Sequence, residues 1–191
     1  FQPDGGFLVP EKCIVAYAEA AMKVGARVQA RERMLSYRLR DDGIVVVSTN
    51  KGEYLTKKLC VTAGAWASKL LPELQHLAQP ERQVLGWFQP LPGEDLAKYK
   101  PDRLPVANIE TSKGLFYYSF PMYQVPGVKV GCYHHFYEKV DPDTINREPT
   151  LQDEEQVRNV LRQFLPGANG PTMSLAACMF TNSPDEHFII D

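Results

Sequence analysis

The sequence predicts a mixed fold of the α+β / α/β class, in which an antiparallel sheet forms the second of two structural units. Residues 10–25 and 150–166 each carry a signal for the start of a helix and a signal for its end. Short β-rich runs separated by glycine, proline and asparagine turns predict antiparallel strands. From Pro80 onward these runs are joined by longer connections, which indicates that a second unit begins there.

The first unit is predicted to open with a helix and to continue as a three-stranded antiparallel meander. Pro10 suits the first turn of a helix and Gly25 ends it. The apolar residues between them that share one face are Ile14, Ala18, Ala21 and Met22. Turns at 42–43 and 50–52 then separate three β-rich runs, which are residues 27–39, 44–47 and 54–62.

The third of these runs ends in a turn of small residues. The stretch "LCVTAGAWASKLL" passes through Ala63, Gly64 and Ala65 into a helix-like segment that ends near Leu71. Because Gly64 has no side chain, either a ligand or another backbone can approach the turn closely. Spacing alone favours a helix packed on its strand over a nucleotide contact.

The second unit is predicted to be an antiparallel sheet followed by one helix. Its β-rich runs are "RQVLGWFQP", "VANIET", "GLFYYSFP" and "GVKVGCYHHFY". Thr150 can cap the helix, and acidic residues suit its N-terminal end. Its apolar stripe consists of Val157, Val160, Leu161 and Phe164, and the helix stops at Pro166-Gly167.

Composition argues against several function classes. The chain has 191 residues, of which 44% are hydrophobic, and this is enough for a buried core. A net charge of −2 with evenly spread charges offers no footprint for nucleic acid or an anionic membrane. No apolar run approaches the roughly 20 residues that cross a bilayer. The four cysteines form no CxxC pair, so we expect no metal, no dense disulfide framework and a reducing compartment.

The run "VKVGCYHHFYEK" holds the densest set of reactive side chains. On a regular strand Lys129 shares a face with Gly131 while His134 lies opposite, and a bulge near Gly131 would change that relation. Adjacent histidines point to opposite faces, which argues against a shared metal and leaves open whether His134 or His135 faces a site. Residue type alone favours a solvated outer-face position for Lys129 over a cavity.

Two further candidates have ordinary interpretations as well. Tyr117 and Tyr118 point to opposite faces of a strand, so one can lie in the core and the other in a cleft. Cys178, taken alone, is more often a small buried apolar residue than a reactive thiol.

Five motifs occur together and in order along the whole chain: "AGAWASKLL", "FYYSFP", "KVDPDTINRE", "FLPGANG" and "CMFTNSPDEHFIID". In this combination the chain resembles the family of monomeric sarcosine oxidases and their relatives that oxidise pipecolate and N-methyl amino acids. The resemblance implies a two-domain FAD-dependent oxidoreductase. It assigns residues 1–72 to an internal part of a Rossmann-like FAD domain, 73–177 to the substrate domain, and 178–191 to a return toward the FAD domain.

The same resemblance assigns roles to individual residues. Cys178 matches the cysteine that attaches covalently to the 8α carbon of the flavin, and Lys129 matches the lysine that promotes the reaction of reduced flavin with oxygen. Tyr118 matches a tyrosine that lines the substrate pocket. His134 is matched to the active-site histidine, although the additional residue Cys132 keeps His135 as an alternative.

Other positions are expected to lie near the cofactor. Ala63, Gly64 and Trp66 belong to the turn that closes the FAD-domain strand, and Phe180 stands where the sarcosine enzyme has a tyrosine. No GxGxxG motif opens a strand–helix unit, so we expect the pyrophosphate-binding turn to lie upstream in a longer parent protein.

The resemblance predicts an oxidase that demethylates sarcosine or a related N-alkyl amino acid to glycine, formaldehyde and hydrogen peroxide, with a secondary amine and oxygen as its small-molecule partners. The fragment alone is expected to be inactive. The parent is expected to be monomeric and cytoplasmic, or peroxisomal if eukaryotic. The alternatives are a pipecolate, N-methyltryptophan or glycated amino acid oxidase, or a non-catalytic binding module.

Overall fold

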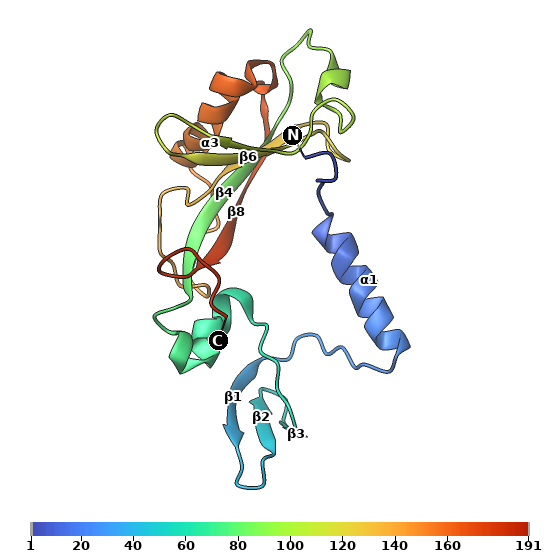
Figure 1. Cartoon of the computed structure of the whole chain (residues 1–191), viewed down its shortest axis with the longest axis vertical. Helices are drawn as coiled ribbons and strands as arrows, with labels where there is room; N and C mark the ends of the chain where they lie inside the picture. Colours follow the sequence, from blue (N-terminus) through green and yellow to red (C-terminus); the bar gives the residue numbers. More distant parts are fainter. Residues whose placement is uncertain (1, 191) are drawn as a thin grey trace. The chain divides into compact units, whose positions relative to one another are not determined.

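The chain begins with a helix whose ends match the signals in the sequence. The structure is a computed structural model that describes residues 2–190 (Figure 1). Helix α1 spans Pro10–Lys23, with Pro10 in its first turn. The chain leaves the helix at Gly25, whose φ of 91° is a backbone conformation that glycine adopts without strain.

A three-stranded antiparallel sheet follows in the order β1-β2-β3, as the meander predicts. Its strands are β1 (Met34–Leu39), β2 (Val45–Thr49) and β3 (Glu53–Thr56). The outer strands are shorter than the β-rich runs at 27–39 and 54–62. Residues 57–63 have no regular structure, and no described strand pairs with them.

Short helical turns connect the two parts of the chain. They are η1 (Gly64–Trp66), α2 (Ala67–Leu70) and η2 (Pro72–Leu74). Two compact units are distinguished: unit 1 comprises Phe1–Ala63 and Lys69–Leu71, and unit 2 comprises Gly64–Ser68 and Pro72–Asp191.

Unit 2 contains a five-stranded antiparallel sheet in the order β5-β6-β7-β4-β8. Its strands are β4 (Gln79–Phe88), β5 (Ala107–Glu110), β6 (Phe116–Phe120), β7 (Val128–Cys132) and β8 (Thr172–Asn182). Two 3₁₀ turns, η3 (Leu96–Tyr99) and η4 (Pro166–Ala168), lie in the connections. The long strands β4 and β8 run side by side, although their sequences are far apart (Figure 1).

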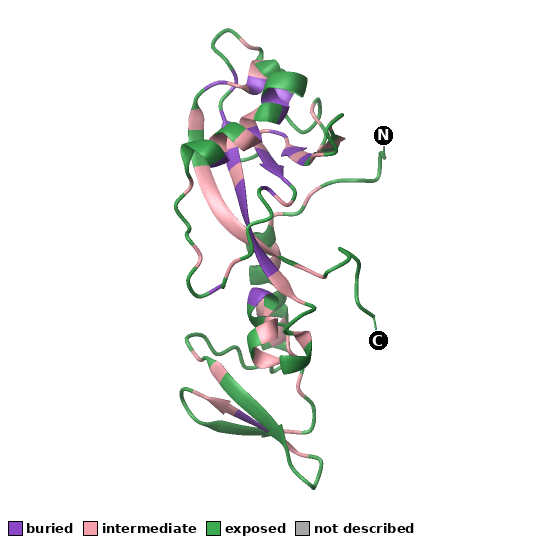
Figure 2. Cartoon of the chain, turned by 90° about the vertical axis from the view of Figure 1, so that its left-hand side faces the viewer, coloured by how far each residue is buried: buried purple, intermediate pink, exposed green. Residues whose placement is uncertain are grey.

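Helix α3 (Leu151–Phe164) packs on one face of this sheet. Thr150 and Asp153 form a reciprocal capping box at its start, in which each side chain bonds the backbone N–H of the other residue. The core between helix and sheet includes Phe88, Tyr99, Tyr117, Val128, Val130, Cys132, Val157, Val160, Leu161 and Ala168. Buried residues cluster on α3 and these strands (Figure 2).

Strand alternation divides the sheet into two faces. We call the side packed against α3 the core face and the opposite side the outer face. Directly paired residues of antiparallel strands share a face. The pairing places the following on the outer face: Glu81, Gln83, Leu85 and Trp87 of β4, Tyr118 and Phe120 of β6, Lys129 and Gly131 of β7, and Ala176, Cys178 and Phe180 of β8.

Candidate functional site

Lys129 lies between two aromatic rings on the outer face. Its Nζ is 5.3 Å from the centroid of the Trp87 ring and 5.1 Å from that of Phe120, its register neighbours on β4 and β6. The residue is half-buried. An ammonium at these distances is attracted by the quadrupoles of both rings. The structure therefore corrects the interpretation of Lys129 as a solvated surface lysine: it is a cation held in position.

Gly131 makes room for Tyr118. The two residues pair across β6 and β7, and the Tyr118 hydroxyl occupies the place where a Cβ on residue 131 would lie. The Tyr118 ring packs edge-on against Phe120 and Tyr133, with centroids 5.9 and 5.2 Å away. Burial raises the pKa of the Tyr118 phenol, and the neighbouring Cys178 and Tyr133 raise it further. Tyr118 is thus a protonated phenol whose side chain extends from β6 over Gly131 of β7.

Cys178 is half-buried on β8, directly opposite Gln83. Burial raises the pKa of its thiol, and the positive charges of Lys129 and Arg147 oppose this rise. Gln83 is fully buried, and neither its amide oxygen nor its amide nitrogen has a hydrogen-bond partner within residues 2–190. A buried amide without partners is costly, so this position is suited to a further polar contact.

The segment after β7 leaves the sheet in a loop of unusual backbone conformation. The strand ends at Cys132, and the chain rejoins β4 where the Arg82 N–H donates to the Glu138 carbonyl at 2.8 Å. Between these points φ is 56° at His134, 27° at His135 and 55° at Tyr137. Positive φ is strained for residues other than glycine. Strand alternation therefore does not decide where the two histidines point.

His134 turns toward the outer face. Its Nδ1 lies 3.2 Å from Oε2 of Glu81, and its Nε2 lies 3.5 Å from Oε2 of Glu186. The ring stacks on Tyr137 with a centroid distance of 5.1 Å. Glu81 pairs with Phe180 and stands two residues from Gln83, so His134 reaches the same face as Cys178.

His135 instead enters the interior beside α3. Its Nε2 lies 2.8 Å from Oδ1 of Asp153, and Arg82 donates to both oxygens of the same carboxylate at 2.8 and 3.0 Å. Thr150 donates to Asp153 from its backbone and its hydroxyl. All three members of the Arg82–Asp153–His135 network are buried.

The network shifts two pKa values. Burial alone would raise the pKa of the Asp153 carboxyl, but the hydrogen bonds from Arg82, Thr150 and His135 hold it well below its usual range. Burial lowers the pKa of His135, and the nearby Asp153 only partly opposes this change. His135 is therefore a neutral ring that donates from Nε2 to an ionised Asp153.

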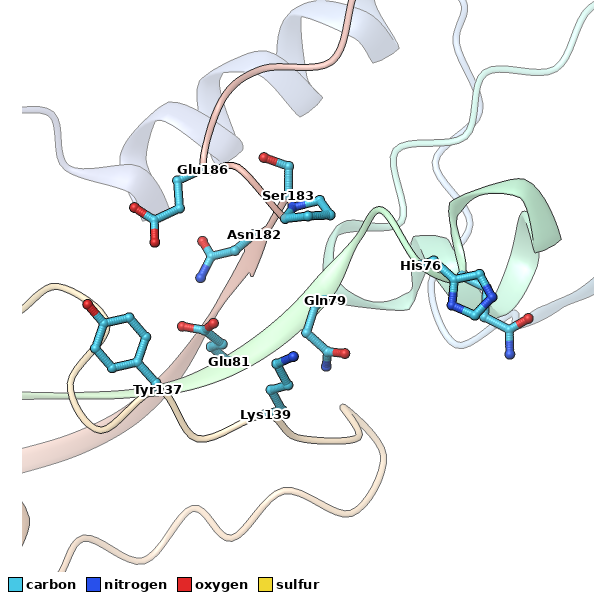
Figure 3. Close-up of a pocket in the computed structure, with 10 residues that line it drawn as sticks. His76, Gln79, Glu81, Tyr137, Lys139, Asn182, Ser183 and Glu186 are labelled. Atoms are coloured by element: carbon cyan, nitrogen blue, oxygen red, sulfur yellow. The ribbon is translucent and has the colours of Figure 1, made fainter.

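A polar cavity of about 440 Å³ lies beside the His134–Glu81 pair. Glu81, Asn182 and Glu186 point toward the same space, and Tyr137 lies beside Glu81 (Figure 3). Its complete lining is Gln75, His76, Gln79, Glu81, Tyr137, Lys139, Asn182, Ser183, Pro184 and Glu186.

The predicted turn of small residues is divided between the units. Ala63 belongs to unit 1, whereas Gly64 and Trp66 belong to unit 2. Within unit 2, η1 lies against β8, and the Trp66 indole donates to Oδ1 of Asp143 at 2.8 Å. Gly64 has a φ of 53° and open space at its Cβ position, which is compatible with the close approach expected there.

Sequence reasoning missed four residues of this region, namely Glu81, Arg82, Gln83 and Asp153. The first three are consecutive buried polar residues, and the strand then continues as the apolar run of residues 84–88. This polar run is a usable signal, because polar side chains are seldom buried without a partner. Asp153 is one of the acidic residues in the first turn of α3, where the sequence predicts only a favourable interaction with the helix N-terminus.

No helix within residues 2–190 combines the length and the apolar character needed to cross a bilayer. Within the same range no three histidine, cysteine or acidic side chains are grouped so that they could hold a metal ion.

The fold is a mixed α/β fold whose larger unit contains a five-stranded antiparallel sheet. The whole chain, residues 1–191, matches the family described as FAD dependent oxidoreductase (DAO). The chain therefore belongs to this family of FAD-dependent oxidoreductases.

Curated relatives agree with this assignment. The chain is 42% identical over 196 residues to monomeric sarcosine oxidase of Bacillus sp. (strain NS-129), covering all of this chain and 49% of the relative. It is 36% identical over 194 residues to N-methyl-L-tryptophan oxidase of Escherichia coli O1:K1 / APEC, with the same coverage of 100% and 49%. The chain thus spans about half the length of the curated relatives it matches.

Solved structures share the fold. Fructosyl amine: oxygen oxidoreductase (Amadoriase I) from Aspergillus fumigatus superposes with a TM-score of 0.73 at 20% identity, covering 97% of this chain and 44% of that one. NikD, an amino acid oxidase of nikkomycin biosynthesis, superposes with a TM-score of 0.67 at 18% identity, covering 92% and 45%.

Proposed function

We propose that this chain is part of a FAD-dependent oxidase that demethylates sarcosine or a related N-alkyl amino acid. The products would be glycine, formaldehyde and hydrogen peroxide. The observation that carries the proposal is the outer face, on which Lys129, Tyr118 and Cys178 lie together. The 42% identity to a monomeric sarcosine oxidase supports the substrate class and a monomeric state. We propose a cytoplasmic location on the same ground.

The outer face fits a flavin. Ala176 has only a short side chain on this face, and the Tyr118 ring covers Gly131, so we propose that a flat ring approaches the sheet over Ala176 and beside Tyr118. Gln83 contributes a buried amide whose two polar atoms still need partners. Cys178 contributes a thiol in register with that amide. We propose that Cys178 holds FAD covalently and that Gln83 lies beneath the bound group.

FAD, when bound, supplies the acceptor for the two electrons that leave the amine. The chain's own residues supply position and charge. Lys129, fixed between two rings, places a cation where it can stabilise negative charge that develops on oxygen during its reduction. Tyr118 forms part of the substrate pocket and donates a hydrogen bond as a neutral phenol. His134 provides a ring nitrogen at the edge of the same face.

The covalent assignment can be tested directly by mass spectrometry of the full-length protein after proteolysis. We expect the peptide containing Cys178 to carry the mass of the flavin, and Cys178→Ser to remove this increment. Cys132→Ser is the matched control and should leave it unchanged, because Cys132 lies on the core face. An unmodified Cys178 peptide from yellow, active protein contradicts the assignment.

The assignment of Lys129 can be tested by stopped-flow kinetics that separate the two half-reactions. Lys129→Met keeps the length of the side chain and removes its charge. We expect the oxidation of reduced flavin by oxygen to slow much more than amine oxidation. Exposed Lys113→Met serves as the control. Unchanged rates in both half-reactions of Lys129→Met would exclude the role.

A substrate panel distinguishes the rival oxidases. The 36% identity to N-methyl-L-tryptophan oxidase keeps larger N-methyl amino acids as the second candidate. Peroxide formation with sarcosine, pipecolate, N-methyltryptophan and a glycated amino acid should rank sarcosine first. A protein that binds no flavin and forms no peroxide with any of them would instead be a non-catalytic module.

We also propose that residues 1–191 alone neither bind FAD tightly nor turn over. The purified chain should therefore lack flavin absorbance. Yellow colour that stays with the protein through acid precipitation would overturn this part of the proposal.

A further inference from the structure

We propose that Glu81 is a positioning residue that orients His134 and decides which of its ring nitrogens carries the proton. The role of His134 rests on the proposed function, whereas the geometry of the pair does not. Nothing in the motifs of the sequence singles out Glu81, which appears only as a polar residue near the start of β4.

The carboxylate of Glu81 depends on His134. Glu81 is only 7% exposed, and a buried carboxylate needs hydrogen-bond donors to offset its lost hydration. Among the described residues, the group that can donate to the Glu81 carboxylate is Nδ1 of His134, which lies 3.2 Å from Oε2. The contact joins residues that are 53 positions apart, so it is a product of the tertiary fold.

The chemistry of the two groups determines the proton position. Nδ1 of His134 has two neighbours, the Glu81 carboxylate at 3.2 Å and the Asn182 amide nitrogen at 3.5 Å. An ionised carboxylate only accepts hydrogen bonds and Glu81 is the nearer of the two, so the proposal places the proton of a neutral His134 on Nδ1. Nε2 then keeps its lone pair. Its protein neighbour is Glu186, 3.5 Å away, whose side chain is 58% exposed and free to give way to another group. His134 is thus prepared to accept a proton or a hydrogen bond at Nε2.

Adjacent residues of β4 hold the histidine pair from opposite sides of the sheet. Glu81 contacts His134 on the outer face, while Arg82 joins Asp153 in holding His135 on the core side. The positive φ values of both histidines are therefore maintained from two directions. Because His135 is anchored in the interior, the backbone beside it is held in place, and Glu81 orients the His134 ring.

The experiment uses the flavin-loaded, full-length protein and three variants. Glu81→Leu removes the acceptor, and Glu81→Gln keeps the size of the side chain while removing its charge. Glu110→Gln is the control, since Glu110 is an exposed carboxylate on β5. Thermal melts identify any variant that fails to fold. If Glu81→Leu fails, the comparison of Glu81→Gln with the wild type tests the proposal.

The first readout is the ¹⁵N spectrum of the histidine side chains, assigned with His134→Gln. In the wild type and in Glu110→Gln we expect the neutral His134 ring to be protonated on Nδ1. In Glu81→Leu the proton should move toward Nε2, the form that free histidine favours, and Glu81→Gln should be intermediate. The proposal is overturned if the wild-type ring is protonated on Nε2, or if the tautomer is the same in the wild type and in Glu81→Leu.

The second readout is steady-state amine oxidation. Loss of a partner that orients a metal-ligating histidine typically costs about 10- to 100-fold, and by analogy we expect a fall of this size in kcat/KM for Glu81→Leu. In the His134→Gln background the same substitution should have little further effect, because Glu81 acts through His134. Fully additive losses would overturn the proposal.

The two readouts separate the possible failures. If the wild type oxidises none of the amines tested, the proposed function fails while the ¹⁵N spectra still decide the role of Glu81. If the wild type is active and Glu81→Leu keeps both its kcat/KM and its tautomer, the positioning role fails and the proposed function stands.

Discussion

The two units of the chain differ sharply in how much of their apolar surface they bury. Unit 2 has a continuous core in which Val128, Val130, Val157 and Leu161 are inaccessible to solvent. Among the described hydrophobic residues of unit 1, only Val46 and Val47 are buried. The contrast is visible residue by residue in Figure 2.

The helices show what this difference means. Both α1 and α3 have 14 residues, but α1 has no buried residue whereas α3 places four against the sheet. Ile14 and Tyr17 of α1 are 66% and 78% exposed. Helical stability in proteins comes mostly from packing of an apolar face, so α3 is well anchored in unit 2 whereas α1 is marginal in unit 1.

The largest expected effect tests the buried network of unit 2. Asp153→Ala leaves the guanidinium of Arg82 buried without its main partner, which should cost about 3 to 5 kcal/mol of unfolding free energy. Both tryptophans of the chain, Trp66 and Trp87, lie in unit 2, so fluorescence during urea unfolding reports on this unit.

Glu155→Ala on the same helix is the control for Asp153→Ala. Glu155 forms an exposed ion pair with Arg162, and its loss should cost less than about 1 kcal/mol. Equal losses for the two variants would mean that the buried network contributes no more than a surface pair.

A pair of truncations compares the two helices directly. Leu161→Ala removes a fully buried side chain of α3 and should cost about 2 to 5 kcal/mol. Ile14→Ala in α1 removes an exposed side chain and should change stability by about 0.5 kcal/mol or less. Urea unfolding of the 191-residue chain, followed by circular dichroism and fluorescence, measures both. A large loss for Ile14→Ala would show that α1 is packed in solution.

A smaller effect is expected on the outer face of unit 2. In Gly131→Ala the new methyl group overlaps the Tyr118 hydroxyl, and relief of this overlap should cost about 1 to 3 kcal/mol. Gly6→Ala in unit 1 meets no atom within 4 Å and should be neutral. Unfolding free energies test this, and a neutral Gly131→Ala would mean that Tyr118 moves aside freely.

The smallest effect concerns pH. Burial lowers the pKa of His135 below its ordinary value of 6.5, with Asp153, Arg82 and Glu138 around it. The unfolded state therefore binds a proton more readily, and the stability of unit 2 should fall as pH decreases below about 6.5. His135→Gln should weaken this dependence.

Exposed His187→Gln is the control for the pH series and should leave the dependence in place. Urea midpoints between pH 5 and 8 provide the measurement. An identical pH profile for wild type and His135→Gln would contradict the assignment.

Much of the fold was predictable because its signals are local. Pro10 and Gly25 mark the ends of α1, and Thr150 with Asp153 marks the start of α3. The length of β3 was overestimated, since the apolar run after Thr56 has no strand partner among the described residues. An apolar run predicts a strand only where a neighbouring strand completes its hydrogen bonds.

The candidate site was predictable only in part. Lys129, Tyr118, Cys178 and His134 were identified from motifs, and the structure places them on one face or at its edge. Their functional roles remain predictions. Glu81 was not identified, because its importance comes from a contact with a residue 53 positions away.

The sequence by itself determined the helix ends, the turns, the β-rich segments and the family resemblance, because these depend on neighbouring residues or on ordered motifs. Only the tertiary structure decided that Cys178 lies opposite Gln83 and that His134 and His135 point to opposite sides of the sheet. Strand register and the positive-φ loop after β7 produce these contacts. Both arise from long-range pairing, which no local pattern of residues specifies.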